Sequence, residues 1–95
     1  MTAVAPESAW QLHPQVSVRP EPFGALLYHF GTRKLSFLKD RTLLEVVRGL
    51  PDAASARAAC EAAGVAEEHV PRYLGALGTL AASHMLVERN EEQTR

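Results

Sequence analysis

The amino-acid sequence predicts an α+β domain in which a three-stranded antiparallel sheet is followed by three helices (β-β-β-α-α-α). Two observations lead to this fold class. Between residues 15 and 38, apolar side chains alternate with a period of two, as they do in strands. From residue 40 onward they recur at spacings of three and four, as they do in helices. Because the strands precede the helices and do not alternate with them, we expect the helices to pack on one side of a small sheet.

Three short segments account for the predicted sheet. The first is QVSVR (residues 15–19), in which valines alternate with polar residues and which nearby prolines close. Phe23, which follows, is expected to pack inward. The second is ALLYHF (25–30) and the third is KLSFL (34–38). Gly31-Thr32 between them predicts a tight turn, since glycine accepts the positive φ of primed hairpin turns. Together the segments predict an antiparallel meander.

Capping residues and helix breakers delimit the three helices. Asp40 is a suitable N-cap for an apolar segment that a glycine and a proline close near residue 50. Asp52 or Ser55 begins a second, alanine-rich helix that runs through residue 63. The third helix extends to about residue 83, and it begins within residues 67–70 because Pro71 is tolerated only in the first turn.

The chain is long enough for one domain with a thin core. We expect residues 1–9 to be a flexible N-terminus, residues 10–88 to form the domain, and residues 89–95 to be a flexible acidic tail. The single cysteine, Cys60, excludes an internal disulfide. No apolar run is long enough to cross a bilayer and no secretory signal is evident, so a cytoplasmic location is the default and no membrane partner is expected.

Catalytic chemistry finds little support in the sequence. No pair of the four histidines has the HxH or HxxxH spacing of metal ligands, and Cys60 has no histidine near it in sequence. The neighbouring carboxylates at residues 67–68 point in different directions on a helix. No glycine-rich loop lies between a strand and a helix to hold a phosphate. We therefore expect no enzymatic activity, no catalytic residue, no metal and no cofactor.

An unpaired strand edge is the better candidate for a function. A small meander has two edges whose backbone N–H and C=O groups can pair with another strand, and peptide capture by strand addition uses such groups. Residues 34–38 are the candidate edge, and an adjacent third helix would place Tyr73, Gly75, Ala76 and Leu80 on the other wall of a groove. The competing interpretation, which we expect to hold for most of them, is that the apolar residues here are core: Leu35, Phe37, Leu74, Leu77 and Leu80. Such an edge can also pair with its own copy, which leaves a homodimer open.

A small DNA-binding regulator is the alternative function, because three short helices and a β-ribbon are the parts of a winged helix-turn-helix. The candidate recognition helix, residues 67–83, carries only Arg72 as a fixed positive charge and opens with two glutamates, whereas DNA binding relies on Lys and Arg. The net charge of −1 gives no basic footprint. Six basic and three acidic residues lie between Arg19 and Gly49, which fits an acidic partner or an ordinary solvated surface. We expect no nucleic-acid partner.

Three longer stretches resemble the PqqD-like family of peptide-recognition domains, which bind the leader peptides of ribosomally made, enzymatically modified peptides. They are GALLYHFGTRKLSFL (24–38), LKDRTLLEVVRGL (38–50) and EEHVPRYLGALGTLAASHMLVE (67–88). The opening WQLHPQVSVRPEPFGALLYHF (10–30) and the segment RKLSFLKDR (33–41) look most like the mycofactocin-system peptide chaperones within that family.

The resemblance implies a winged-helix-like fold with no catalysis of its own. It implies that the leader of a precursor peptide adds as a strand beside Lys34–Leu38, lies against the helix at Arg72–Leu80, and is presented to a radical S-adenosylmethionine enzyme that holds its own iron–sulfur clusters. The expected peptide-binding residues are Arg33, Lys34, Leu35, Ser36, Phe37, Leu38, Arg72, Tyr73, Ala76 and Leu80. Exposed Arg33, Lys34 and Arg72 would attract acidic leader residues. If the Ser36 N–H faces the peptide, Ser36→Pro is expected to weaken binding.

Overall fold

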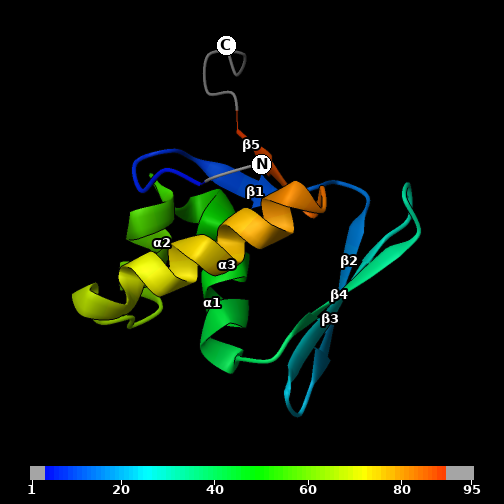
Figure 1. Ribbon diagram of the computed structural model, residues 1–95, viewed down its shortest axis with the longest axis horizontal. Coiled ribbons are helices and arrows are strands. Elements are labelled where there is room, and N and C mark those ends of the chain that lie inside the picture. The colour runs from blue at the N-terminus through cyan, green and yellow to red at the C-terminus, as the bar shows by residue number, and fades with distance from the viewer. Residues whose placement is uncertain (1–3, 90–95) are drawn as a thin grey trace.

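The computed structural model describes residues 4–89, and its elements follow the order expected from the sequence (Figure 1). A three-stranded antiparallel sheet precedes three helices, which confirms the α+β fold class. Two further strands, β1 and β5, lie near the two ends of the described chain. The elements are β1 (Trp10–Leu12), β2 (Val16–Glu21), β3 (Gly24–His29), β4 (Lys34–Leu38), α1 (Arg41–Gly49), α2 (Ala56–Ala62), α3 (Val70–Ala82) and β5 (Leu86–Glu88), with 3-10 turns at Leu50–Asp52 and Glu67–His69.

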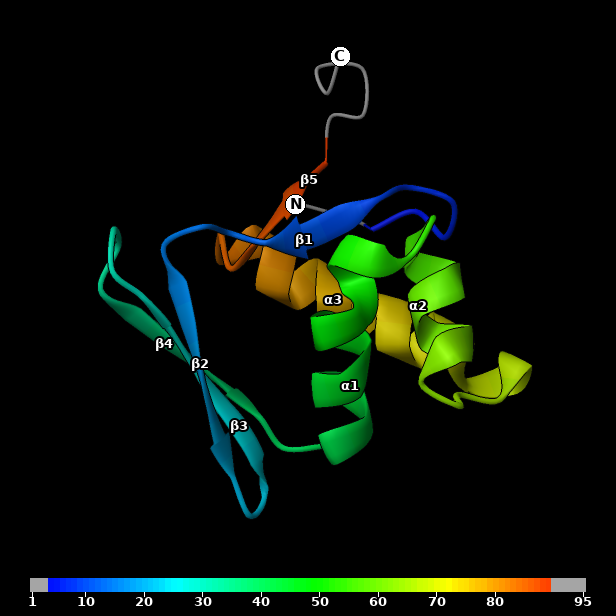
Figure 2. The same cartoon turned by 180° about the vertical axis from the view of Figure 1, so that it is seen from behind.

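The sheet has the strand order β2-β3-β4, and its two faces have different surroundings. Figures 1 and 2 show it standing to one side of the helices, and α1 packs against β3 and β4. On the face toward α1, Ala25, Leu27 and Leu38 are fully buried. On the opposite face, Leu35 and Phe37 of β4 are exposed. The alternation predicted for these strands is therefore present, and it separates a core face from an outer face.

The sequence did not indicate the second, two-stranded sheet, which β1 and β5 form. Trp10 is paired with Glu88 and Leu12 with Leu86 in an antiparallel register. The His13 N–H donates to the Met85 carbonyl at 2.9 Å, which continues the pairing by one residue. Figures 1 and 2 show this ribbon beside the C-terminal end of α3. It ties the start of the domain to its end.

The helices begin at the caps that the sequence predicted. The Asp40 carboxylate accepts a hydrogen bond from the Thr42 N–H at 2.8 Å, and the Ser55 hydroxyl accepts one from the Ala58 N–H at 3.1 Å. Of the two candidates for the second helix, Ser55 is therefore the cap. Pro71 lies in the first turn of α3, as expected, where its missing N–H costs no intrahelical bond.

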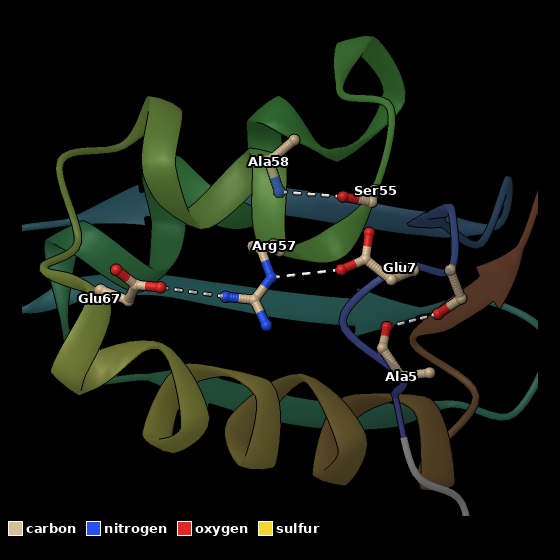
Figure 3. A network of polar contacts seen from close by, with 7 residues as sticks. Ala5, Glu7, Ser55, Arg57, Ala58 and Glu67 are labelled. Atoms are coloured by element: carbon tan, nitrogen blue, oxygen red, sulfur yellow. Dashed lines mark hydrogen bonds and ion pairs between the residues drawn. The ribbon is translucent and has the colours of Figure 1, made fainter.

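The two end segments make more contacts than we expected of flexible ends. Val4 is buried in the core, and the carbonyls of Pro6 and Ser8 accept hydrogen bonds from the first N–H groups of α2. Figure 3 shows Arg57 of α2 between two carboxylates, at 3.3 Å from Glu7 and 3.9 Å from Glu67. At the other end, the Arg89 guanidinium donates to the carbonyls of Pro51 and Ala53. The described contacts of the two end segments thus include Val4 and Arg89; residues 1–3 and 90–95 lie outside the described residues.

Candidate functional site

In an antiparallel sheet, hydrogen-bonded and non-hydrogen-bonded residue pairs alternate along each strand, and we call this alternation the hydrogen-bond parity. It identifies which backbone groups of β4 are free. The Phe30 N–H donates to the Gln15 carbonyl at 2.9 Å, across the paired residues Val16 and His29. In an antiparallel ladder, a bond that flanks a pair in this way marks the pair as non-hydrogen-bonded. His29 and every second residue before it, Leu27 and Ala25, therefore direct their N–H and C=O groups toward β4.

The same alternation fixes the direction of the groups on β4. Lys34, Ser36 and Leu38 are the register partners of His29, Leu27 and Ala25, so their backbone groups point back into the sheet. Leu35 and Phe37 then direct their N–H and C=O groups away from β3. Within residues 4–89, no hydrogen bond reaches these four groups. The edge of β4 thus offers two donors and two acceptors to another strand.

The opposite edge, along β2, is less suited to pairing. By the same parity, Val16, Val18 and Pro20 direct their backbone groups outward. The Val16 N–H already donates to the His13 carbonyl at 2.9 Å. Pro20 has no N–H, and proline at an edge position is a common way to block strand addition. Among residues 4–89, Val18 alone presents a free N–H at this edge, so β4 is the more open edge of the sheet.

The predicted site residues on β4 differ in what they expose. Lys34, Leu35 and Phe37 are exposed and Ser36 is half-buried, whereas the Leu38 side chain lies in the core. The interpretation of Leu35 and Phe37 as core residues is therefore wrong, and for Leu77 and Leu80 it is confirmed. Ser36 directs its N–H toward β3, so the condition for the Ser36→Pro prediction is not met.

The turn before β4 also departs from the expectation. The loop between the strands spans residues 30–33, and Arg33 takes the positive φ, at 64°, that we expected of Gly31. His29 explains this turn, because its Nδ1 accepts hydrogen bonds from the Gly31 N–H at 3.0 Å and the Thr32 N–H at 3.1 Å. Its carbonyl also accepts from the Arg33 N–H at 2.7 Å. The turn thus sets where Arg33 and Lys34 begin the open edge.

On α3, the predicted residues divide in the same way. Arg72 is exposed and Ala76 is half-buried, while Tyr73 and Leu80 are buried. The Tyr73 hydroxyl donates to the Asp40 carboxylate at 2.7 Å, and the Arg72 guanidinium lies 5.6 Å from the centre of the Tyr73 ring. This contact brings α3 to the segment directly after β4. Along the rest of its length, however, β4 packs mainly on β3 and α1, not on α3.

Electrostatics support the link between Asp40 and Tyr73. The Tyr73 hydroxyl bond, followed by the Thr42 and Leu43 N–H groups and the nearby Arg72 charge, lowers the pKa of the Asp40 carboxyl. The same bond to Asp40, together with burial, raises the pKa of Tyr73. Both shifts favour a proton on Tyr73 and a charge on Asp40 at neutral pH. The hydrogen bond between them ties α3 to the segment between β4 and α1.

Two further properties of the described chain bear on function. Among residues 4–89, no three His, Cys, Asp or Glu side chains gather closely enough to hold a metal ion. None of the helices in that part combines the length and the apolarity that a membrane span requires. The DNA-binding alternative gains no support either, because Arg72 is the single basic residue of α3.

Comparison with known proteins identifies the family. The model of the "Peptide chaperone MftB family" matches residues 9–87. A peptide chaperone MftB of Mycobacterium ulcerans (strain Agy99) is 64% identical over 92 residues, which cover 96% of this chain and 84% of that protein. The proteins of the same name from Mycolicibacterium smegmatis and Mycobacterium tuberculosis (strain H37Rv) are each 63% identical, over 92% and 88% of this chain and 85% and 77% of their own lengths. No solved structure matches. The chain therefore belongs to the MftB peptide chaperone family, as the resemblance in its sequence indicated.

Proposed function

We propose that this protein is a non-catalytic chaperone for the mycofactocin precursor peptide. It binds the leader of the peptide as an additional strand beside β4 and delivers it to a radical S-adenosylmethionine enzyme. The observation that carries the proposal is the β4 edge, where Leu35 and Phe37 direct their backbone groups outward while Pro20 blocks the other edge. The similarity to proteins named peptide chaperone MftB supports a peptide as the guest.

Backbone pairing alone gives only part of a useful affinity. The four outward groups of Leu35 and Phe37 allow four hydrogen bonds, each contributing about 1 kcal/mol net, so the edge supplies about 4 kcal/mol. A dissociation constant of 1 μM corresponds to about 8 kcal/mol. Side-chain contacts must therefore supply at least as much as the backbone, and they must also choose the sequence of the guest.

We infer that the exposed part of α3 around Arg72 and Ala76 supplies the second wall. Gly75 is exposed, and a Cβ built there meets no atom of the described chain within 4 Å, so a guest has room on this side. Tyr73 and Leu80 anchor α3 in the core, because their side chains are buried, and buried Leu38 does the same for β4. Arg33, Lys34 and Arg72 attract acidic residues of the leader, chiefly by speeding encounter.

A titration of the full chain with the leader of the precursor peptide tests this site. Backbone amide signals are followed by NMR, and we expect the largest shifts at residues 33–38 and at Arg72–Ala76. Among the strand residues, the amides of Leu35 and Phe37 should move downfield and become protected from exchange, because they gain a hydrogen bond. Shifts that centre on β2 or on the β1–β5 ribbon would refute strand addition at β4.

A proline variant isolates the backbone contribution. Phe37→Pro removes an outward N–H, and we expect it to weaken leader binding about fivefold more than Phe37→Ala, since one hydrogen bond contributes about 1 kcal/mol. Both variants lose the same aromatic side chain, so the alanine variant is the matched control. Equal affinities for two folded variants would show that the Phe37 N–H takes no part in binding.

A further inference from the structure

One face of the sheet carries an exposed apolar surface that strand addition leaves uncovered. We call it the outer sheet face, and it consists of Phe23, Leu26, Tyr28, Phe30, Leu35 and Phe37. Phe23, Phe30, Leu35 and Phe37 are between 46% and 61% exposed, and they are the only large hydrophobic residues exposed among residues 4–89. The expectation that Phe23 packs inward is therefore wrong.

The aromatic side chains of this face form a continuous surface. Tyr28 and Phe30 meet edge to face with ring centres 5.0 Å apart, and Phe23 lies 6.5 Å from Phe37. Between β2 and β4 the surface is hollowed, with a volume of about 380 Å³. The hollow is lined by Ser17, Arg19, Leu26, Tyr28, Phe30 and Leu35. Exposed apolar surface concentrated at one place on a small domain is typical of a docking site.

A guest strand beside β4 does not cover this face, because it lies in the plane of the sheet. Leu35 and Phe37 nevertheless belong to both surfaces: their backbone groups point to the guest, and their side chains lie on the outer sheet face. A bound peptide would therefore extend the face by one strand. A protein that docks there meets the chaperone and the guest side by side.

We propose that the outer sheet face is the docking surface for the enzyme that modifies the peptide. This inference rests on the proposed function and adds where its second partner binds. The rim of the face along β4 is basic, since Arg33 and Lys39 precede and follow β4 and are exposed, whereas Arg19 on β2 is ion-paired with Glu21 at 3.1 Å and adds no net charge. The enzyme surface that fits is apolar at its centre and acidic at its rim.

A second copy of this chain fits the rim less well. If two β4 strands paired antiparallel with full overlap, Leu35 would lie opposite Phe37 of the copy, and Arg33 and Lys39, just beyond the two ends of β4, would come near Lys39 and Arg33 of the copy. This places like charges together at both ends of the pairing, which destabilises it. An acidic partner has the opposite effect at the same positions. The charges therefore disfavour self-association through the β4 edge, while two copies that met through the outer sheet face would bring the same exposed cations, Arg33 and Lys39, near one another.

The test compares two affinities for the same variants of the full chain. Phe30→Ser and Phe23→Ser remove exposed rings away from the outward groups of β4, and Ala62→Ser on α2 is the control substitution on the far side. Binding of the precursor leader is measured by calorimetry, and binding of the purified radical S-adenosylmethionine enzyme is measured with the leader at saturation. We expect at least tenfold weaker enzyme binding for the two phenylalanine variants, unchanged leader binding, and wild-type behaviour for Ala62→Ser. Amide spectra confirm folding.

Each outcome distinguishes this inference from the proposed function. If the leader binds and enzyme binding is unchanged in both phenylalanine variants, the docking surface is refuted while the chaperone function stands. If the wild-type chain binds no leader, the proposed function itself fails. Sedimentation measures the oligomeric state of the chain without leader or enzyme. If the wild type is a dimer and Phe30→Ser is a monomer, the outer sheet face binds a second copy, and the inference is overturned.

Discussion

The contact between Asp40 and Tyr73 allows a quantitative test of how α3 is held at the segment directly after β4. The Asp40 carboxylate accepts from the Thr42 N–H at 2.8 Å and from the Tyr73 hydroxyl at 2.7 Å. Losing the cap costs about 1 kcal/mol, and losing a hydrogen bond to a charged group costs about 1.5 kcal/mol. We therefore expect Tyr73→Phe to lower the free energy of unfolding by about 1.5 kcal/mol and Asp40→Ala to lower it by about 2.5 kcal/mol.

The double variant separates the two contributions. Because Asp40→Ala already removes the hydroxyl's partner, adding Tyr73→Phe should cost almost nothing more, and the double variant should also lose about 2.5 kcal/mol. Urea unfolding can be followed by the fluorescence of Trp10, the single tryptophan, which is buried. For a domain of this size, Tyr73→Phe should lower Tm by about 6–12 °C. Additive losses of about 4 kcal/mol in the double variant would refute the coupling.

The same contact also affects how the folding stability depends on pH in the acid range. The Tyr73 hydroxyl is the largest cause of the lowered pKa of Asp40, so the charged form is favoured in the folded state. The stability that this gives is complete above the ordinary pKa of Asp, 3.8, and it is lost as the pH falls through the lower folded value. In Tyr73→Phe, the acid loss of stability should be smaller. If Tyr73→Phe lost the same amount of stability in acid as the wild type, the hydrogen bond between Tyr73 and Asp40 would not form in solution.

Two further predictions concern the framework of the open edge. Burial, followed by the nearby His13 and His84, lowers the pKa of His29, so the imidazole of the unfolded chain is protonated at a higher pH than that of the folded chain. The stability contributed by neutral His29 is therefore complete above about pH 6.5 and declines as the pH falls below that value. His29→Gln should flatten this decline, which is measured as urea midpoints from about pH 7.5 to 5.5. Gly24→Ala should destabilise the fold by about 2–4 kcal/mol, because φ at this position is +151° and a Cβ would collide with the Leu38 carbonyl. Gly75→Ala, where a Cβ meets nothing, is its matched control and should stabilise α3 by up to about 1 kcal/mol. If Gly24→Ala were as stable as the wild type, the close approach of Gly24 to the Leu38 carbonyl would be contradicted.

Local signals in the sequence were sufficient for the helices and the main sheet. Asp40 and Ser55 are capping residues whose chemistry acts within three positions, so they could be identified without tertiary information. The β1–β5 ribbon could not, because strands of three residues carry no measurable period and Trp10 and Glu88 meet from opposite ends of the chain. Its pairing depends on tertiary packing.

The candidate site shows a similar division. Alternation placed Leu35 and Phe37 on one face, but both faces of β4 contain apolar residues, and only packing against α1 shows which is buried. The free backbone groups depend on hydrogen-bond parity, which side-chain patterns do not encode. The positive φ of Arg33 likewise follows from the bonds that His29 makes to the turn.

Pro20 has a consequence for how many strands the sheet can recruit. A sheet with two open edges can grow from both sides, and identical chains can then join into an endless array. With Pro20 on β2, this chain can extend its sheet only past β4. If a guest strand occupies that place, as proposed, the chain keeps no second edge of its own that is equally open, and the expected stoichiometry is one peptide per chain.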